Sequence, residues 1–275
     1  MKKLGFSIPG SKTLPIRGDI YVPEGSGAFP VLIFCHGFKG FKDWGAFPYF
    51  FEKISSLGII CVSFNFSHNG IGQNPIEFTE LENFKNNNLS LEVDDLLLLL
   101  RELRAGTILD RALFKSQAIT LIGHSRGGSA VLRAASIDQG IKQVITLASI
   151  SKVPPVSPET AASWREKGEH IVENMRTGQK MPMGLLMLED LLSTKTAIED
   201  ACRKIYCPVH AIHGGNDTIV PPQAAIEISS WCKNGSYDII PDADHVFGVR
   251  HPFVGTTPEF ESVIKIISKI ILASS

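Results

Sequence analysis

The sequence has no long hydrophobic run. Its strongest apolar block, Leu96–Leu100, is closed by the charged pairs Asp94-Asp95 and Arg101-Glu102. A helix that crosses a bilayer needs about 20 apolar residues, so we expect no membrane span and assign this block to a buried helix. The two lysines after Met1 precede no apolar stretch, and we expect no signal peptide.

Charge of one sign is not in excess either. The 275 residues include 27 Lys and Arg against 28 Asp and Glu, for a formal net charge of −1. Binding of nucleic acid requires a basic face, so we expect no nucleic-acid partner. A hydrophobic content of 44% and a mean hydropathy of +0.10 predict a well-packed globule with one large domain.

The cysteines are scattered and odd in number. They are Cys35, Cys61, Cys202, Cys207 and Cys232. We expect buried, reduced thiols and therefore a cytoplasmic protein. The sequence has no His, Asp or Glu cluster with metal-ligand spacing, and no glycine-rich phosphate loop with the required lysine. We therefore expect neither a metal nor another cofactor.

The sequence does contain a strand, a sharp turn and a helix around Ser125. An apolar run, Ala118–Ile122, stops at Gly123, and a run of small residues begins at Gly128. The turn has the pattern Gly-x-Ser-x-Gly. So abrupt a turn predicts a positive φ at Ser125, a conformation retained where function uses it. Gly123 and Gly127 remove β-carbons that would collide across the turn. An ordinary glycine-rich turn is the alternative interpretation.

Short apolar segments alternate with helical segments along most of the chain. Besides the strand before Ser125, we expect strands at Ile16–Val22, Val31–Cys35, Ile59–Phe64, Val144–Ala148, Val209–Ile212 and Tyr237–Ile240. Helices are expected at 43–57, 91–104, 128–135, 221–232 and 258–272, with Ser90 as the cap of the second. This alternation predicts an α/β fold with a mostly parallel, twisted sheet and helices on both faces.

The alternation breaks after the fifth of these strands. Proline pairs and short helical patches occupy residues 151–204, where Arg176–Gln179 could form the turn of a hairpin. We therefore expect a core made of residues 1–150 and 205–275 and a small cap inserted between them. Four of the five methionines lie in the insertion, either over an apolar substrate or in the joint with the core. The polar segment Asn65–Asn88 is expected to be a surface loop.

A serine hydroxyl is a weak nucleophile unless a base, here a histidine oriented by a third group, takes its proton. In a parallel sheet such partners come from loops at the carboxyl ends of other strands. Asp217 follows one predicted strand, and His245 follows the next. Both side chains are therefore candidates to meet Ser125.

These features together resemble the α/β-hydrolase family. Gly123-His124-Ser125-Arg126-Gly127 matches the family's nucleophile elbow, and the order Ser, Asp, His along the chain matches as well. The resemblance implies an α/β-hydrolase fold with residues 151–204 in the place of the cap. It also implies that Ser125 is the nucleophile, His245 the general base and Asp217 the acid that orients it.

The loop His36-Gly37-Phe38 resembles the family's His-Gly-x oxyanion loop. The resemblance implies that the backbone N–H groups of Phe38 and Arg126 hold the oxyanion of a tetrahedral intermediate. His36 and Gly37 would support this loop, with His36 bracing it rather than contacting substrate.

Other side chains compete for two of these roles. Asp242 and Asp244 are nearer to His245 along the chain, but nearness within a loop does not aim a carboxylate at the ring, and we favour Asp217. His251 is the second candidate base; His245 is preferred because it directly follows the last strand.

The remaining polar residues of the motifs have structural interpretations that we prefer. His124 is expected to point under the turn, and His213 to hold the turn that carries Asp217. Arg126 could meet an acidic substrate, but a salt bridge within the protein is favoured. His68-Asn69 stands where many relatives have Arg-Gly-His-Gly, and this departure leaves its role open.

The sequence thus predicts a serine hydrolase that cleaves the carboxylic ester, or a related acyl bond, of a small molecule through an acyl-enzyme on Ser125. A peptidase or thioesterase with the same three residues is one alternative. Cofactor-free haloperoxidase or C–C bond cleavage is another. A non-catalytic ligand-binding protein on the same fold is an alternative of a different class.

Overall fold

The computed structural model of the protein describes residues 1–273. Eight strands form one sheet in the order β1-β2-β4-β3-β5-β6-β9-β10. From β4 to β10 all neighbouring strands are parallel, whereas β2 is antiparallel to both of its neighbours. The bounds are β1 Lys2–Pro9, β2 Pro15–Val22, β3 Phe29–Cys35, β4 Ile60–Asn65, β5 Phe114–His124, β6 Gln143–Leu147, β9 Val209–Gly214 and β10 Gly235–Ile240.

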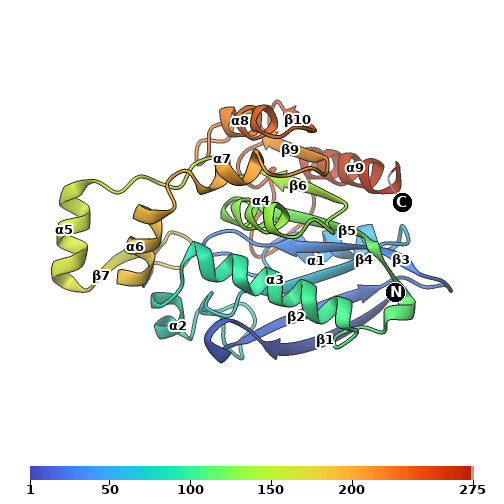
Figure 1. The fold of residues 1–275 in the computed structure, drawn as a ribbon, viewed down its shortest axis with the longest axis horizontal. Helices are drawn as coiled ribbons and strands as arrows, with labels where there is room; N and C mark the ends of the chain where they lie inside the picture. Colours follow the sequence, from blue (N-terminus) through green and yellow to red (C-terminus); the bar gives the residue numbers. More distant parts are fainter. Residues whose placement is uncertain (274–275) are drawn as a thin grey trace.

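Helices cover both faces of this sheet (Figure 1). One apolar core lies between the sheet and the helices α3 (Leu89–Ala105), α4 (Arg126–Ile137) and α8 (Gln223–Trp231). The other lies between the sheet and the helices α1 (Phe47–Ser55) and α9 (Pro258–Ala273). The predicted α/β fold with a mostly parallel sheet is therefore confirmed.

Burial on both faces explains why the central strands are continuous apolar runs. Every residue of β4 and β6 is buried, and so is every residue of β3 after Phe29, as expected for parallel strands between two helix layers. The edge strand β1, which the sequence analysis did not predict, has only Ile8 buried. Its polar and apolar residues alternate because one face is open to solvent.

The segment 65–88 differs from the surface loop that we predicted. Residues 66–72 are buried, and the short helix α2 (Leu81–Lys85) follows. The buried polar groups are hydrogen-bonded: the Ser67 N–H donates to Asp95 Oδ2 at 2.7 Å, and the Ile71 N–H donates to Asn69 Oδ1 at 3.0 Å. Asparagine and glycine are typical of surface loops, but a segment rich in them can be buried where hydrogen-bond partners satisfy its polar groups. Composition alone does not show whether such partners exist.

Two helix starts also differ from the prediction. Asn88, not Ser90, caps α3, because its side chain accepts a hydrogen bond from the Leu91 N–H at 2.7 Å. The Ser90 hydroxyl instead donates to Asp190 at 2.5 Å. Helix α1 begins at Phe47 rather than residue 43, because Gly45 has φ +52, which a right-handed helix cannot contain.

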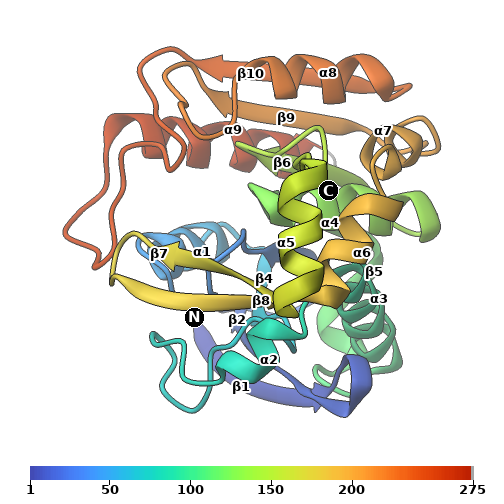
Figure 2. The ribbon, with the colours of Figure 1, turned by 90° about the vertical axis from the view of Figure 1, so that its left-hand side faces the viewer.

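Most of the predicted insertion, residues 151–204, lies across the carboxyl ends of the parallel strands, whereas its last helix packs against α4 and α8 of the core (Figures 1 and 2). It contains α5 (Pro158–Lys167), the antiparallel hairpin of β7 (Glu169–Asn174) and β8 (Gln179–Gly184), α6 (Leu185–Ser193) and α7 (Ala197–Cys202). The hairpin turn that we considered at Arg176–Gln179 is confirmed.

The methionines of the insertion fill its joint with the core. Met181 is buried against Phe41 and Phe84, and Met187 is buried in the core that contains α3 and α4. Met175 at the hairpin tip is 84% exposed. Of the two interpretations of these residues, packing of the joint is therefore the one the contacts support.

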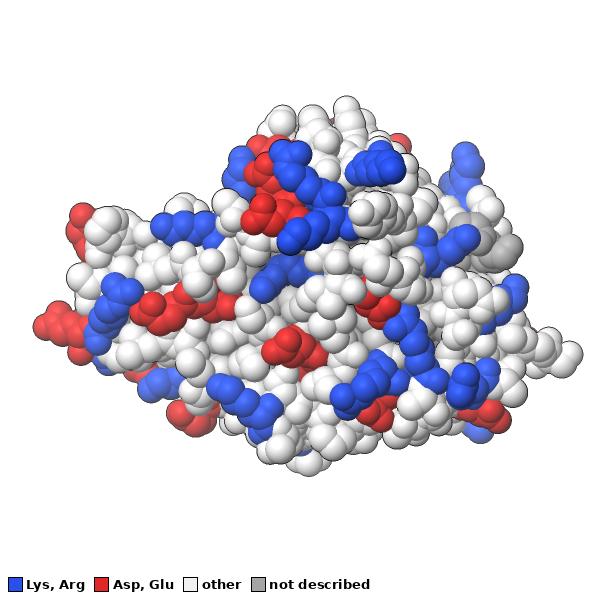
Figure 3. Space-filling model, in the orientation of Figure 1, with Lys and Arg blue, Asp and Glu red and all other residues white. Residues whose placement is uncertain are grey.

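The structure also shows the state of the cysteines, the arrangement of possible metal ligands and the distribution of surface charge. All five cysteines are free, and all except Cys207 are buried. Within residues 1–273 no helix has the length and hydropathy that a bilayer crossing requires, and no group of His, Cys, Asp and Glu side chains could hold a metal ion. On the face drawn in Figure 3, acidic and basic side chains are interspersed.

Candidate active site

Ser125 occupies the turn between β5 and α4 in a strained conformation, with φ 55° and ψ −120°. Its N–H donates to the Leu147 carbonyl oxygen at 2.9 Å, which ties the turn to the neighbouring strand. A β-carbon on Gly123 would lie 2.2 Å from the Gly127 oxygen, and one on Gly127 would lie 2.3 Å from the Cys35 oxygen. Only glycine fits at either position.

The loop after β3 packs directly on this turn. A β-carbon on Gly37 would come within 2.9 Å of Ser125 Cβ. The next residue, Phe38, lines a pocket together with Ser125. Within residues 1–273, neither the Phe38 N–H nor the Arg126 N–H donates a hydrogen bond. Two backbone donors beside the serine hydroxyl are thus available to an external acceptor.

The structure brings His245 and Asp217 together. His245 Nδ1 lies 2.8 Å from Asp217 Oδ2. The other carboxylate oxygen of Asp217 accepts the N–H groups of Ile219 at 2.8 Å and Val220 at 2.9 Å. His213 Nε2 lies 3.2 Å from Asp217 Oδ2 and 3.0 Å from the Val220 carbonyl oxygen, so His213 holds the Asp217 turn as predicted.

These contacts keep the buried carboxyl of Asp217 ionised. Burial by itself would raise the pKa of Asp217. Hydrogen bonds from His213, from His245 and from the Val220 N–H outweigh burial, so that the pKa lies well below its usual range. Asp217 is therefore an acceptor at neutral pH, and it requires His245 Nδ1 to be the donor. Nε2 is left as the ring nitrogen that can accept a proton.

The competing residues have other partners. Asp244 accepts the N–H groups of Val246 and Gly248 and pairs with Arg250 at 2.9 Å. Asp242 is exposed. His251 Nδ1 accepts the Gly45 N–H at 2.9 Å, and its ring packs on Phe41 and Trp44. Asp244 and His251 are thus engaged elsewhere and Asp242 faces solvent, and none of these three side chains pairs with His245 or lines the Ser125 pocket.

Two further histidines brace the site. His36 Nδ1 donates to the Gly37 carbonyl oxygen at 2.9 Å, and its Nε2 lies 3.3 Å from Asn69 Nδ2. Asn69, whose role the sequence left open, thus supports the loop beside Ser125. His124 Nε2 lies 3.0 Å from the backbone oxygen of His245. The His245 loop and the turn at Ser125 are therefore joined through this ring.

Both bracing rings are buried in neutral form, and we expect them to make the protein acid-sensitive. Burial lowers the pKa of His36 to about 4, and burial with the neighbouring His245 lowers that of His124 to about 3. An unfolded histidine binds its proton near pH 6.5. Between about pH 6.5 and pH 4 the unfolded chain therefore binds more protons than the folded chain. As the pH is lowered through this range, the free energy of unfolding falls by roughly 1.4 kcal/mol per pH unit for each ring.

Urea unfolding at pH 7, 6 and 5 measures this slope. His124→Asn removes one of the two rings, so it should reduce the slope by roughly 1.4 kcal/mol per pH unit, whatever its effect on stability at pH 7. An identical slope in the wild-type protein and the variant would contradict the assignment.

A pocket of about 150 Å³ joins the serine and the imidazole. Its lining contains Ser125, His245, Lys39 and the aromatic rings of Phe38, Trp44 and Phe47. The sequence analysis missed Lys39, Trp44 and Phe47. Their position shortly after the His-Gly-x loop was the available signal, but side-chain directions in a loop cannot be deduced from sequence.

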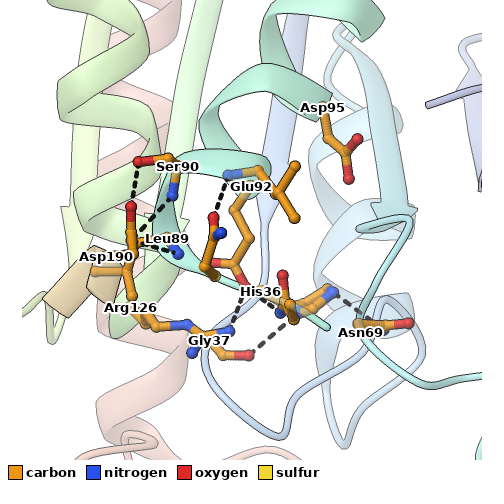
Figure 4. A network of polar contacts seen from close by, with 12 residues as sticks. His36, Gly37, Asn69, Leu89, Ser90, Glu92, Asp95, Arg126 and Asp190 are labelled. Atoms are coloured by element: carbon orange, nitrogen blue, oxygen red, sulfur yellow. Dashed lines mark hydrogen bonds and ion pairs between the residues drawn. The ribbon is translucent and has the colours of Figure 1, made fainter. Parts of the chain in front are cut away.

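Arg126 forms the predicted salt bridge within the protein. Its guanidinium pairs with Glu92 of α3, a carboxylate that is 3% exposed and also accepts from Asn87 at 3.0 Å (Figure 4). The guanidinium lies 4.5 Å from the ring centroid of Phe38. Glu92 thereby fixes the Arg126 side chain, which in turn lies over the Phe38 ring. The sequence signal for such a partner was a glutamate on the apolar face of a helix.

Comparison with known proteins identifies the family. Residues 30–185, more than half of the chain, match the family defined by the alpha/beta hydrolase fold. The chain belongs to the α/β-hydrolase family. Membership of this family supports hydrolase activity, and the predicted resemblance is confirmed.

Individual α/β-hydrolase relatives are distant. An "uncharacterized 31.7 kDa protein in traX-finO intergenic region" of Escherichia coli is 22% identical over 258 residues, 81% of this chain and 85% of the relative. Est1E from Butyrivibrio proteoclasticus with bound ferulic acid superposes with a TM-score of 0.72 at 20% identity, covering 98% of both chains. An esterase domain from Rhodothermus marinus gives 0.67 at 19% identity, again over 98% of both chains. At such identities the solved structures show a shared fold.

Proposed function

We propose that this α/β hydrolase is a serine hydrolase that cleaves a carboxylic ester through an acyl-enzyme formed on Ser125. One observation carries the proposal: Ser125 and His245 line the same pocket, while His245 Nδ1 is held by the buried carboxylate of Asp217. This arrangement fits a nucleophile, a base and an orienting acid. Similarity in fold to Est1E and to an esterase domain supports an ester as substrate.

In the proposed reaction, Ser125 Oγ attacks the ester carbonyl carbon while His245 Nε2 takes the hydroxyl proton. The carbonyl π electrons move to the oxygen, which the N–H groups of Phe38 and Arg126 stabilise by about 3 kcal/mol for each donor. Collapse of this intermediate expels the alcohol, which receives the proton from His245. Water then gives a proton to His245 and attacks the acyl carbon. The bond from this carbon to Ser125 Oγ breaks, Oγ takes the proton back from His245, and the acid is released.

Residues 151–204 would act as the cap of this site, over a core of residues 1–150 and 205–275. The hairpin of the insertion is fastened to the segment 65–88 of the core, because Gln179 Nε2 donates to the Phe78 carbonyl oxygen at 2.8 Å. Asp190 of α6 accepts the N–H groups of Leu89 and Ser90 at 3.0 and 3.3 Å. Side chains of the insertion could thus limit the size of a small-molecule substrate.

Labelling with a fluorophosphonate tests this proposal. We expect one covalent adduct per chain, located on the peptide that contains Ser125, and hydrolysis of p-nitrophenyl esters of graded acyl length. Thioesters and aminoacyl substrates in the same panel separate an esterase from a thioesterase or a peptidase. A folded protein that is not labelled and hydrolyses none of them would instead favour the ligand-binding alternative.

A further inference from the structure

Lys39 is a cation on the wall of the candidate active site. It follows Phe38 on the loop after β3 and lines the same pocket as Ser125 and His245. Its backbone has φ 54°, a left-handed conformation that is uncommon for a residue other than glycine. Backbone strain of this kind persists where the surrounding structure holds it.

The ammonium of Lys39 has no carboxylate partner within residues 1–273, in contrast to its neighbours. Lys42, three positions later, pairs with Asp19 and Asp43, and Arg126 pairs with Glu92. Lys39 Nζ donates to the carbonyl oxygen of Glu173 on β7 at 2.9 Å and lies 5.4 Å from the ring centroid of Phe38. One of its three N–H donors is thus used, and its charge is not neutralised.

The surroundings remove part of the hydration of this charge. The Lys39 side chain is partly buried beside an aromatic ring, and this burial lowers its pKa. Partial removal of an ammonium from water is unfavourable unless a counter-charge compensates it. A neutral donor is sufficient to bind the Glu173 carbonyl oxygen. This contact therefore accounts for a hydrogen-bond donor at position 39, but it does not account for a positive charge there.

We propose that the substrate is a small ester that also carries a carboxylate, and that Lys39 is the residue that selects it. The inference rests on the proposed esterase function and deepens it. An ammonium on the wall of a pocket that contains Ser125 can reach an anionic group a few bonds from the ester carbonyl. A cavity of about 150 Å³ accommodates a molecule the size of benzene, so the acid part is short, comparable to a four-carbon dicarboxylic half ester.

Matched pairs of substrates test this selection. p-Nitrophenyl hemisuccinate is compared with p-nitrophenyl butyrate, which places the carboxylate on the acyl side. 4-Butyryloxybenzoate compared with phenyl butyrate places it on the alcohol side. We expect kcat/KM to favour the anionic member of one pair, and the pair affected shows which side of the ester faces Lys39.

The decisive readout is the ratio of kcat/KM for the anionic ester to that for the neutral ester. Lys39→Gln keeps a donor for the Glu173 carbonyl but removes the charge, and it should lower the ratio by at least about 10-fold. Lys39→Arg should restore most of it. Lys180→Gln is the matched control: it removes one exposed positive charge from β8 and should leave the ratio unchanged.

Several outcomes would overturn the inference. It fails if the Lys39→Gln ratio equals that of the wild-type protein, or if Lys180→Gln lowers the ratio as much, since the effect would then be long-range attraction. It fails independently of turnover if monoethyl succinate binds Ser125→Ala protein and its Lys39→Gln double variant equally in calorimetry. Failure of the proposed function is distinct, because Ser125 would then remain unlabelled and the neutral esters uncleaved.

Discussion

Replacing Ser125 by alanine is expected to lower kcat for a p-nitrophenyl ester by about 10⁴- to 10⁶-fold. The variant lacks the oxygen that forms the acyl-enzyme, so only a slow direct attack by water remains. The size of the loss follows from the geometry, because the half-buried hydroxyl shares its pocket with His245 and lies beside two unpaired backbone N–H groups. Steady-state kinetics with the ester panel measure it.

The chain itself offers a matched control. On the edge of the sheet, His210 Nδ1 lies 2.7 Å from Ser236 Oγ, and His210 Nε2 lies 2.8 Å from Asp238 Oδ2. These are the same three residue types, but they occupy adjacent strands β9 and β10 rather than the turn beside the oxyanion loop. Ser236→Ala should keep full activity and full labelling. Equal losses in the Ser125 and Ser236 variants would contradict the proposed nucleophile.

Asp217→Asn is expected to reduce kcat by about 10³- to 10⁴-fold with little change in the fold. An asparagine can still accept the N–H groups of Ile219 and Val220 at the position of Oδ1. Its NH₂ group would then face His245 Nδ1, which must become the acceptor. The proton moves to Nε2, and the ring can no longer take the proton of Ser125.

Asp244→Asn provides the comparison for Asp217→Asn. Asp244 accepts two backbone N–H groups of its own loop and pairs with Arg250, so its replacement should leave kcat within a few-fold of the wild-type value. Unfolding curves of both variants at pH 7 establish that the fold is retained. Similar activity of the two folded variants would remove Asp217 from the proposed mechanism.

The local sequence was sufficient to predict features that depend on residues close together in the chain. The Gly-x-Ser-x-Gly pattern predicted a strained turn, and Ser125 has φ 55° there. The flanking glycines permit this turn because a β-carbon at Gly123 or Gly127 would lie only 2.2 or 2.3 Å from a backbone oxygen. The apolar runs of β3, β4 and β6 likewise indicated strands, and these strands are buried in the structure because helices cover both faces of the sheet.

Prediction failed where burial depends on a distant partner. Residues 66–72 looked like a surface loop, yet the carboxylate of Asp95, 28 positions away, accepts the buried N–H of Ser67. Ser90 looked like a helix cap, yet Asp190, which lies 100 positions away, takes its hydroxyl. The sequence of the segment that each aspartate contacts gives no indication that Asp95 or Asp190 is its acceptor.

The amino-acid sequence by itself determined the alternating α/β fold, the glycine-flanked turn at Ser125 and the two short loops that supply Asp217 and His245, because each depends on residues a few positions apart. Only the tertiary structure decided that Asp217 rather than Asp244 meets the imidazole and that Glu92 holds Arg126. It also decided that Lys39 lines the pocket with no carboxylate partner among the residues that the structure describes. These depend on where the packed sheet places side chains from separate strands and helices, and distance along the chain carries little information about that.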